Sequence, residues 1–319
     1  MRVRQGENMF KCFEEGFDIS RLDREPFKFN HQLLSHPALA MDSLSRSLPQ
    51  LPADRIMYSK GLSDLGINFD RAHIEHGNGK TLEQTIETIR TSSSYIAVRD
   101  PEDHPSFREL YQDLVDDVGR LMRGNGRARR AITPRMWMFI ASPGAQTPFH
   151  FDRYSNFLMQ IRGSKQVAVF PNFESSIVPP HECESYMDRA EAKPLWKPEF
   201  DRHATKFDFS PGEAIHIPYI AGHYVKNGME DVSISLSFFF QTEQTRRWTN
   251  AMRFNHRVRP HLARVGMVPT PVGHRSSRDA AKALMLRVMD KGRSWRLRLS
   301  GAKQGCMGML NAGLALAVI

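Results

Sequence analysis

Two histidines and one aspartate have the residue types and the spacing of a metal site. His150 and Asp152 stand two residues apart within the segment TPFHFD, and His223 follows 71 residues after Asp152. Residues two apart on a β-strand point to the same face, so His150 and Asp152 can converge on one ion. Two imidazoles and one carboxylate on one side of a cation leave positions open, as in non-haem Fe(II) oxygenases. These three residues, which we name the metal triad, therefore indicate oxygen chemistry.

The third member of the triad follows a predicted turn and a short predicted strand. The turn is SPGE at 210–213, and the strand is the apolar run AIHIP at 214–218, which ends at a proline. His216 lies within this run and is a second candidate ligand by residue type. Alternation along the strand favours His223, and we expect His216 to be structural.

A lysine is expected beside the triad. The segment 154–171 reads as two strands around a turn, and the pair at 162–163 predicts a two-residue hairpin in which Gln160 lies opposite Lys165. Gln160 shares the parity of the triad residues before it, so Lys165 should project towards the metal side. A lysine on the inner face of a barrel needs an anion to neutralise it. A solvent-exposed lysine at a strand start is the alternative.

Three segments carry a family resemblance. They read TPFHFD at 147–152, SNFLMQIRGSKQVAVFP at 155–171 and PGEAIHIPYIAGHYVKN at 211–227. Together they resemble the JmjC and factor-inhibiting-HIF branch of the Fe(II)/2-oxoglutarate dioxygenases, and the bacterial cupin-like proteins that share its barrel. The resemblance covers about residues 135–240. It implies a mainly β fold with flanking helices: a double-stranded β-helix, or jelly-roll cupin barrel, with N-terminal α/β support and a helical C-terminal segment.

The resemblance also implies a role for each site residue. The metal triad would hold Fe(II), and a lysine and a threonine that match Lys165 and Thr147 would bind the C5 carboxylate of 2-oxoglutarate. Asn156 would lie beside this cosubstrate. Ser237 stands where factor inhibiting HIF carries a second asparagine, and its hydroxyl still offers a donor and an acceptor. This departure weakens the match to that enzyme's substrate more than the cofactor assignment.

The implied activity is hydroxylation of an unactivated C–H bond with O2, coupled to decarboxylation of 2-oxoglutarate to succinate. Asp152 favours hydroxylation, or demethylation through a hydroxymethyl group, because the halogenating relatives lack this carboxylate. A protein or peptide side chain is the favoured substrate, and a small molecule or natural product is a close alternative. A non-catalytic metal-binding cupin that acts as a sensor is a third reading, against which the two cosubstrate anchors, Lys165 and Thr147, argue.

Periodicity and capping signals predict the elements around the barrel. Helices are predicted around 31–48, at 82–92 after a capping box of Thr81 and Gln84, and from a cap at Ser106 onwards. Strands are predicted at 95–99, from 136 onwards and at 232–240, where alternation sets Ser233, Ser235 and Ser237 on one face. A mobile loop over the cofactor mouth is expected around 179–184. The predicted regions are N-terminal support over 1–130, a catalytic core over 131–242 and a basic helical segment over 243–319.

The positive charge of the chain is concentrated near its C-terminus. The net charge is +9, and residues 246–303 contain 15 Arg or Lys against two Asp. A helix is predicted around 277–290, with Ala281, Leu284 and Val288 facing inward. Such an amphipathic helix favours packing, or a homodimer through C-terminal helices as the family resemblance implies, and a nucleic acid or an acidic partner is the alternative. The apolar tail at 307–319 could also lie on a membrane surface.

Cysteine usage and hydropathy bear on the compartment. The three cysteines are far apart and form no CxxC pair, which fits a reducing environment. No signal-peptide core is visible, and no apolar run reaches the roughly 18–20 residues that a membrane span needs. We therefore expect a cytoplasmic protein without a transmembrane segment.

Overall fold

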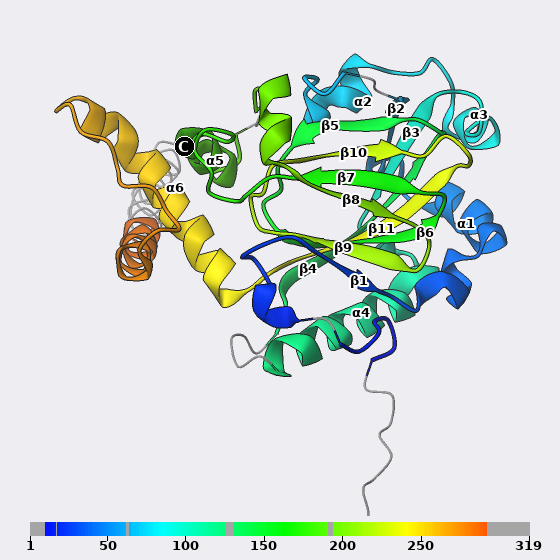
Figure 1. The fold of residues 1–319 in the computed structure, drawn as a ribbon, viewed down its shortest axis with the longest axis horizontal. Coiled ribbons are helices and arrows are strands. Elements are labelled where there is room, and N and C mark those ends of the chain that lie inside the picture. The colour runs from blue at the N-terminus through cyan, green and yellow to red at the C-terminus, as the bar shows by residue number, and fades with distance from the viewer. Residues whose placement is uncertain (1–9, 17, 62–63, 125–129, 191–193, 292–319) are drawn as a thin grey trace, which may run out of the picture. The chain divides into compact units, whose positions relative to one another are not determined.

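Two antiparallel sheets face each other and form the predicted jelly-roll barrel (Figure 1). The computed structural model describes residues 10–16, 18–61, 64–124, 130–190 and 194–291. The larger sheet has seven strands, in the order β1 (Phe27–Asn30), β9 (Glu213–Ile217), β6 (Ser155–Arg162), β11 (Ser233–Gln241), β4 (Ile132–Ala141), β3 (Ser94–Arg99) and β2 (Ile56–Lys60). The smaller sheet has four, in the order β5 (Gln146–His150), β10 (His223–Asn227), β7 (Lys165–Val169) and β8 (Thr205–Phe209).

The predicted hairpin at residues 162–163 is wrong. β6 pairs with β9 and β11 in the larger sheet, whereas β7 pairs with β8 and β10 in the smaller one. The turn therefore carries the chain from one sheet to the other. Gly163 has a positive φ of 68°, and a Cβ there would lie 2.7 Å from the carbonyl oxygen of Val232. Only glycine fits this turn without strain.

The two faces of β11 explain how the larger sheet separates the core from the cavity. Ser233, Ser235 and Ser237 share the inner face, as the alternation predicts. The opposite face packs apolar side chains against helix α4 (Pro105–Gly124) in one large buried cluster. Leu114 of α4 and Leu236 of β11 are both fully buried there. Burial on this scale contributes roughly 1.5–3 kcal/mol for each large side chain and fixes the sheet that carries the site.

Helices on the N-terminal side are shorter than predicted. Besides α4, the barrel unit contains α1 (Met41–Ser47), α2 (Ala72–Glu75), α3 (Leu82–Glu87) and α5 (Pro180–Met187), with 3-10 turns between them. The helix predicted over 31–48 breaks at η3 (Pro37–Leu39), because a proline nitrogen cannot continue the helical hydrogen bonding. The capping box of α3 is confirmed. The segment expected as a loop at 179–184 instead begins α5.

The start of α4 lies one residue earlier than the predicted cap. The helix begins at Pro105, so Ser106 lies within its first turn. The backbone N–H of Ser106 donates a hydrogen bond to Nδ1 of His104 at 3.3 Å. Proline is favoured at the first helical position because its missing N–H has no partner to lose there.

The described residues 247–291 belong to a second compact unit, and the division falls within helix α6 (Glu243–Ala263). Residues 276–291 are helical, but the predicted inward face is wrong. Leu284 and Val288 are 61% and 64% exposed, whereas Asp279 and Leu286 are buried. Asp279 turns inward because its carboxylate accepts the N–H of Gly273. The apolar tail at 307–319 lies outside the described residues, and the three-region division remains a prediction.

None of the helices within the described ranges combines the length and the apolar character needed to cross a membrane.

Candidate metal centre and cosubstrate pocket

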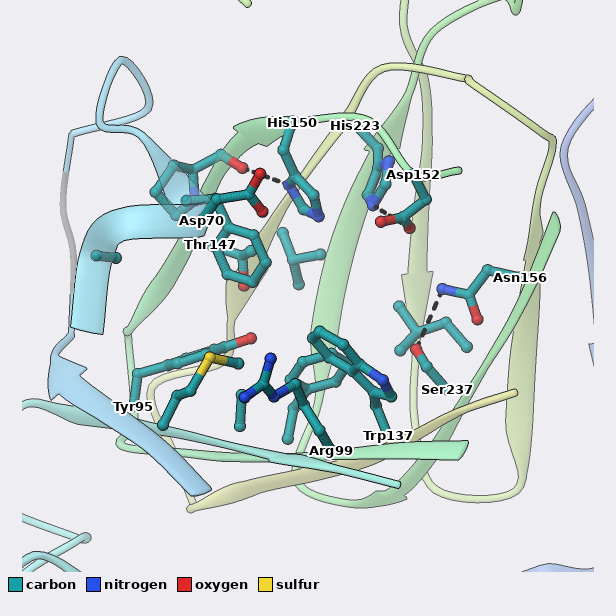
Figure 2. A pocket seen from close by; sticks show the side chains of 18 of the residues that line it. Asp70, Tyr95, Arg99, Trp137, Thr147, His150, Asp152, Asn156, His223 and Ser237 are labelled. Atoms are coloured by element: carbon teal, nitrogen blue, oxygen red, sulfur yellow. Dashed lines mark hydrogen bonds and ion pairs between the residues drawn. The ribbon is translucent and has the colours of Figure 1, made fainter. Parts of the chain in front are cut away.

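The structure brings the three residues of the metal triad together at one end of the smaller sheet (Figure 2). His150 ends β5 and lies directly opposite His223, the first residue of β10. Asp152 lies two residues beyond the end of β5 rather than on the strand. Its Oδ2 is nevertheless 3.6 Å from Nε2 of His223. One candidate ligand atom from each residue lies within 4.8 Å of the other two.

Hydrogen bonds set the tautomers of both histidines. Nδ1 of His150 lies 2.8 Å from the carbonyl oxygen of Pro148, and Nδ1 of His223 lies 3.0 Å from that of Ala221. A carbonyl only accepts, so each Nδ1 donates its proton and each Nε2 keeps a free lone pair. Histidines that bind metals are oriented in this way by the hydrogen bond at their other nitrogen.

The carboxylate of the metal triad has a buried oxygen without a hydrogen bond. Oδ2 of Asp152 accepts none from the described residues. Burial, and then the charge of Asp70, raise the pKa of Asp152 to about 7. Burial lowers the pKa of His223 to about 4. The pKa of His150 lies well below its usual value, mainly because of burial and secondly because of the electrostatic effect of His223. Two neutral imidazoles and an unsatisfied carboxylate oxygen therefore fit a divalent metal cation.

Packing holds this end of the site in place. Phe69, from the 3-10 turn η6 (Phe69–Arg71), stacks on His150 with ring centroids 4.4 Å apart and an angle of 29°. Gly222, which precedes His223, is needed because the ring of Phe149 packs closely against its backbone. A Cβ at that position would lie 2.7 Å from the ring of Phe149. A larger residue at 222 would therefore push His223 away from its partners.

Lys165 lies in the same cavity, at the start of β7. Its side chain is almost fully buried, with 6% of the residue exposed. Nζ donates to Oγ of Ser235 at 2.7 Å, and no described carboxylate pairs with it. Burial alone lowers the pKa of Lys165 to about 7. A buried amine with one neutral partner favours an anionic ligand, which would restore its charge.

The other predicted cosubstrate residues line this cavity as well. Nδ2 of Asn156 donates to Oγ of Ser237 at 3.1 Å, while the amide oxygen of Asn156 is buried without a described partner. Thr147, on β5, shares a hydrogen bond with the hydroxyl of Tyr95. The structure thus gathers Thr147, Asn156, Lys165 and Ser237 around one space, and their roles as cosubstrate contacts remain predictions.

His216 lies outside the cavity lining and has a structural environment. Its Nε2 accepts the N–H of Asp23 at 3.0 Å, and its Nδ1 donates to the carbonyl oxygen of Asn156 at 3.2 Å. Both ring nitrogens are therefore engaged with backbone groups. His216 has no lone pair left for a metal, in agreement with the expectation from alternation.

The cavity has a volume of about 380 Å³ and extends beyond the predicted residues. Its lining also includes Tyr95, Arg99 and Arg135, which the sequence did not assign to the site. These three lie on strands whose place in the sheet depends on pairing between distant segments, and no local pattern marks them. Ser235, which accepts the hydrogen bond of Lys165, was signalled by the serine alternation in β11.

The profile of the family described as "Cupin-like domain" matches residues 49–246. This chain belongs to that family. In this cupin-like protein the match includes every strand of both sheets except β1. It also includes the metal triad and the residues around Lys165. The narrower assignment to the factor-inhibiting-HIF branch remains a prediction.

Two curated relatives cover part of this cupin-like chain. HSPB1-associated protein 1 of Rattus norvegicus is 27% identical over 157 residues, and the human protein of the same name is 29% identical over 157 residues. Each match covers 44% of this chain and 31% of the relative, so the chain spans under a third of those proteins.

Similar solved structures include ycfD of E. coli, with 12% identity and a TM-score of 0.46 over 87% of this chain and 68% of that chain. An oxalate decarboxylase gives 19% identity and a TM-score of 0.24 over 41% of this chain and 29% of that chain. At these scores neither structure assigns an activity.

Proposed function

We propose that this cupin-like protein is an Fe(II)- and 2-oxoglutarate-dependent dioxygenase that hydroxylates an unactivated C–H bond. One atom of O2 would convert a substrate C–H bond to C–OH. The other atom would enter the carboxylate of succinate, which forms as 2-oxoglutarate loses CO2. The observation that carries the proposal is Lys165, a buried amine that has no anionic partner among the described residues and lies in the same cavity as the His-Asp-His cluster. A cupin that binds only a metal has no use for this costly group.

The proposed roles follow from the contacts of each side chain. His150 and His223 would present Nε2 to Fe(II), and Asp152 would present its unsatisfied Oδ2. Fe(II) with 2-oxoglutarate and O2 supplies the oxidising chemistry. Lys165 would hold the C5 carboxylate through a charge-assisted hydrogen bond.

The polar residues of the two sheets would complete the cosubstrate site. Thr147 would add a second contact to the C5 carboxylate from the neighbouring β5 strand. Asn156 and Ser237, already hydrogen-bonded to each other, would limit where the cosubstrate lies. Apolar residues such as Leu158 and Val225 line the same cavity and would keep stray water out.

The hydroxylated group would belong to a protein or peptide side chain or to a small molecule. The cavity volume is at the lower end of the range for small-molecule sites, about 300–1,000 Å³, and the cosubstrate takes part of it. Either a compact molecule or a single side chain therefore fits the remaining space.

Anaerobic titration tests the proposal. Protein loaded with Fe(II) should develop a metal-to-ligand charge-transfer absorption band when 2-oxoglutarate is added, because the keto acid chelates the metal. The Asp152→Ala variant should lose Fe(II) binding and the band. The His181→Ala variant, which changes an exposed histidine of α5, should keep both and serves as the matched control. Fe(II)-loaded protein without a band would move the assignment to a metal-binding sensor.

A further inference from the structure

The inner face of the larger sheet continues past the cosubstrate residues onto β3 and β4. Tyr95 and Arg99 share this face of β3, and Arg99 lies directly opposite Trp137 of β4. Arg135 lies two residues before Trp137 on β4 and also lines the cavity. Figure 2 shows the Arg99 side chain rising into the cavity on the wall that also carries Tyr95 and Trp137. This wall is the remaining candidate for contact with the substrate.

The two arginines of this wall have no counter-charge among the described residues. Nη2 of Arg99 donates to the backbone carbonyl of Asp54 at 2.6 Å, while its buried Nε makes no hydrogen bond. Arg135 forms neither a hydrogen bond nor an ion pair with any described residue. Neighbouring Arg55, in contrast, is paired with two carboxylates at 2.6 Å. The positive charge of Arg99 and Arg135 is thus left available to the cavity.

The proposed cofactors do not neutralise this charge. The two positive charges of the metal and that of Lys165 are balanced by Asp152 and by the two carboxylates of 2-oxoglutarate. Arg153 donates to the backbone carbonyls of Tyr186 and Ala190, and Asp70 is the other carboxylate of the lining. Once metal and cosubstrate are bound, an excess of positive charge therefore remains at the substrate wall. Such a wall attracts an anion and disfavours a cationic side chain.

Aromatic rings flank the guanidinium groups. Trp137 contacts Phe239 edge to face with centroids 5.7 Å apart, and Phe139 lies 6.0 Å from Tyr95. All four line the cavity. Rings on this scale bury an apolar or aromatic body, while a guanidinium binds carboxylate or phosphate oxygens. The wall therefore has one place for an anionic head and one for an apolar body.

We propose that the substrate carries an oxyanion, either carboxylate or phosphate, on an apolar body, and that Arg99 binds the oxyanion. This inference rests on the proposed function, since it assigns the space that the cosubstrate leaves. Arg99 would be a specificity-determining residue: it fixes which end of the substrate points away from the metal. Arg135 would add long-range attraction from the edge of the same wall.

Matched pairs of probes test the inference without turnover. Protein is loaded with Zn(II), which is redox-inactive, and saturated with 2-oxoglutarate. Binding of 4-phenylbutyrate is compared with that of 4-phenylbutanamide, and phenyl phosphate with phenol, by ligand-observed NMR. The two pairs distinguish a carboxylate from a phosphate as the preferred head group. Because a charge-assisted hydrogen bond contributes about 1.5–3 kcal/mol, at least one anion should bind about tenfold or more tightly than its neutral counterpart.

Variants then assign the preference to Arg99. Arg99→Gln should abolish the preference for the anion, and Arg99→Lys should retain part of it because the charge is kept. Arg90→Gln, which changes an exposed arginine paired with Asp231, should behave as wild type. The affinity for 2-oxoglutarate should stay unchanged in all three.

Several outcomes would overturn the inference. They are the absence of an anion preference in both pairs, a preference that survives Arg99→Gln, and a loss of 2-oxoglutarate affinity in Arg99→Gln. The last result would place the cosubstrate, not the substrate, at Arg99. Failure of 2-oxoglutarate to bind wild-type protein, with an Arg99-dependent preference intact, would refute the proposed function and leave the anion site standing.

Discussion

Lys165→Met should make the cosubstrate-free protein more stable while it weakens cosubstrate binding. Burial lowers the pKa of Lys165 from 10.5 to about 7. In the unfolded chain the amine stays protonated up to about 10.5, so below pH 7 the folded protein bears the whole cost of the buried ammonium. At about 1.4 kcal/mol for each pH unit between these values, that cost is about 5 kcal/mol.

Two effects set the net change. Methionine removes the buried charge, but it also leaves Oγ of Ser235 without its donor, which costs about 1–3 kcal/mol. The expected gain in the free energy of unfolding is therefore about 2–4 kcal/mol at pH 7. This gain in stability should shrink as the pH rises from 7 to 10.5. Over that range the folded wild-type amine is neutral, and the free energy needed to remove the proton from the unfolded chain falls with each pH unit. Affinity for 2-oxoglutarate should fall about 30-fold or more, because one partner of a buried ion pair is lost.

Urea denaturation between pH 7 and 10 measures the stability, and calorimetric titration of Zn(II)-loaded protein with 2-oxoglutarate measures the affinity. Lys226→Met is the matched control, because this lysine lies on the adjacent strand β10 and is exposed. It should change neither quantity. A Lys165→Met variant that is less stable at pH 7 and binds 2-oxoglutarate as wild type does would refute the reasoning.

Further predictions concern the parts of the fold that support the site. Burial raises the pKa of Asp23 to about 6 from 3.8, so its contribution to stability is full below 3.8 and is lost as the pH rises through 6. The stability of wild type relative to Asp23→Asn should thus increase by up to about 1.4 kcal/mol per pH unit as the pH falls from 6 to 4; a constant difference in urea denaturation would contradict this. Leu114→Ala should cost about 2–5 kcal/mol of unfolding free energy without changing 2-oxoglutarate affinity, since Leu114 packs on the outer face of the sheet. Gly222→Ala should weaken Zn(II) binding because its Cβ would meet the ring of Phe149, whereas Gly77→Ala, with open space around it, should bind Zn(II) as wild type does; equal metal affinity in both variants would remove the constraint on His223.

The family resemblance implied the barrel, and the alternation of its strands predicted which side chains face its interior. Ser233, Ser235 and Ser237 fall on the cavity side because a period of two leaves no other choice once the apolar residues between them are buried. The convergence of His150 and Asp152 followed from the same rule, although Asp152 lies past the strand end. Local spacing was thus enough to bring candidate ligands together.

The pairing between distant strands could not be predicted in this way. Lys165 was expected on the inner face through a hairpin with Gln160, yet β6 and β7 belong to different sheets. The lysine reaches the cavity because β7 lies beside β10, a pairing between segments about 60 residues apart. The failed inward face at 276–291 has a similar cause. The carboxylate of Asp279 bonds to the backbone of Gly273, and this polar contact overrides the apolar stripe.

Succinate formation tests the central claim most directly. Wild-type protein with Fe(II) and 2-oxoglutarate is exposed to O2, and succinate is counted against the same mixture with Asp152→Ala and with His181→Ala. The account predicts slow succinate release without added substrate in wild type and His181→Ala, and none above background in Asp152→Ala. Fe(II)-loaded wild-type protein that binds 2-oxoglutarate and yet forms no more succinate than Asp152→Ala, even with the anion that Arg99 prefers, would contradict it.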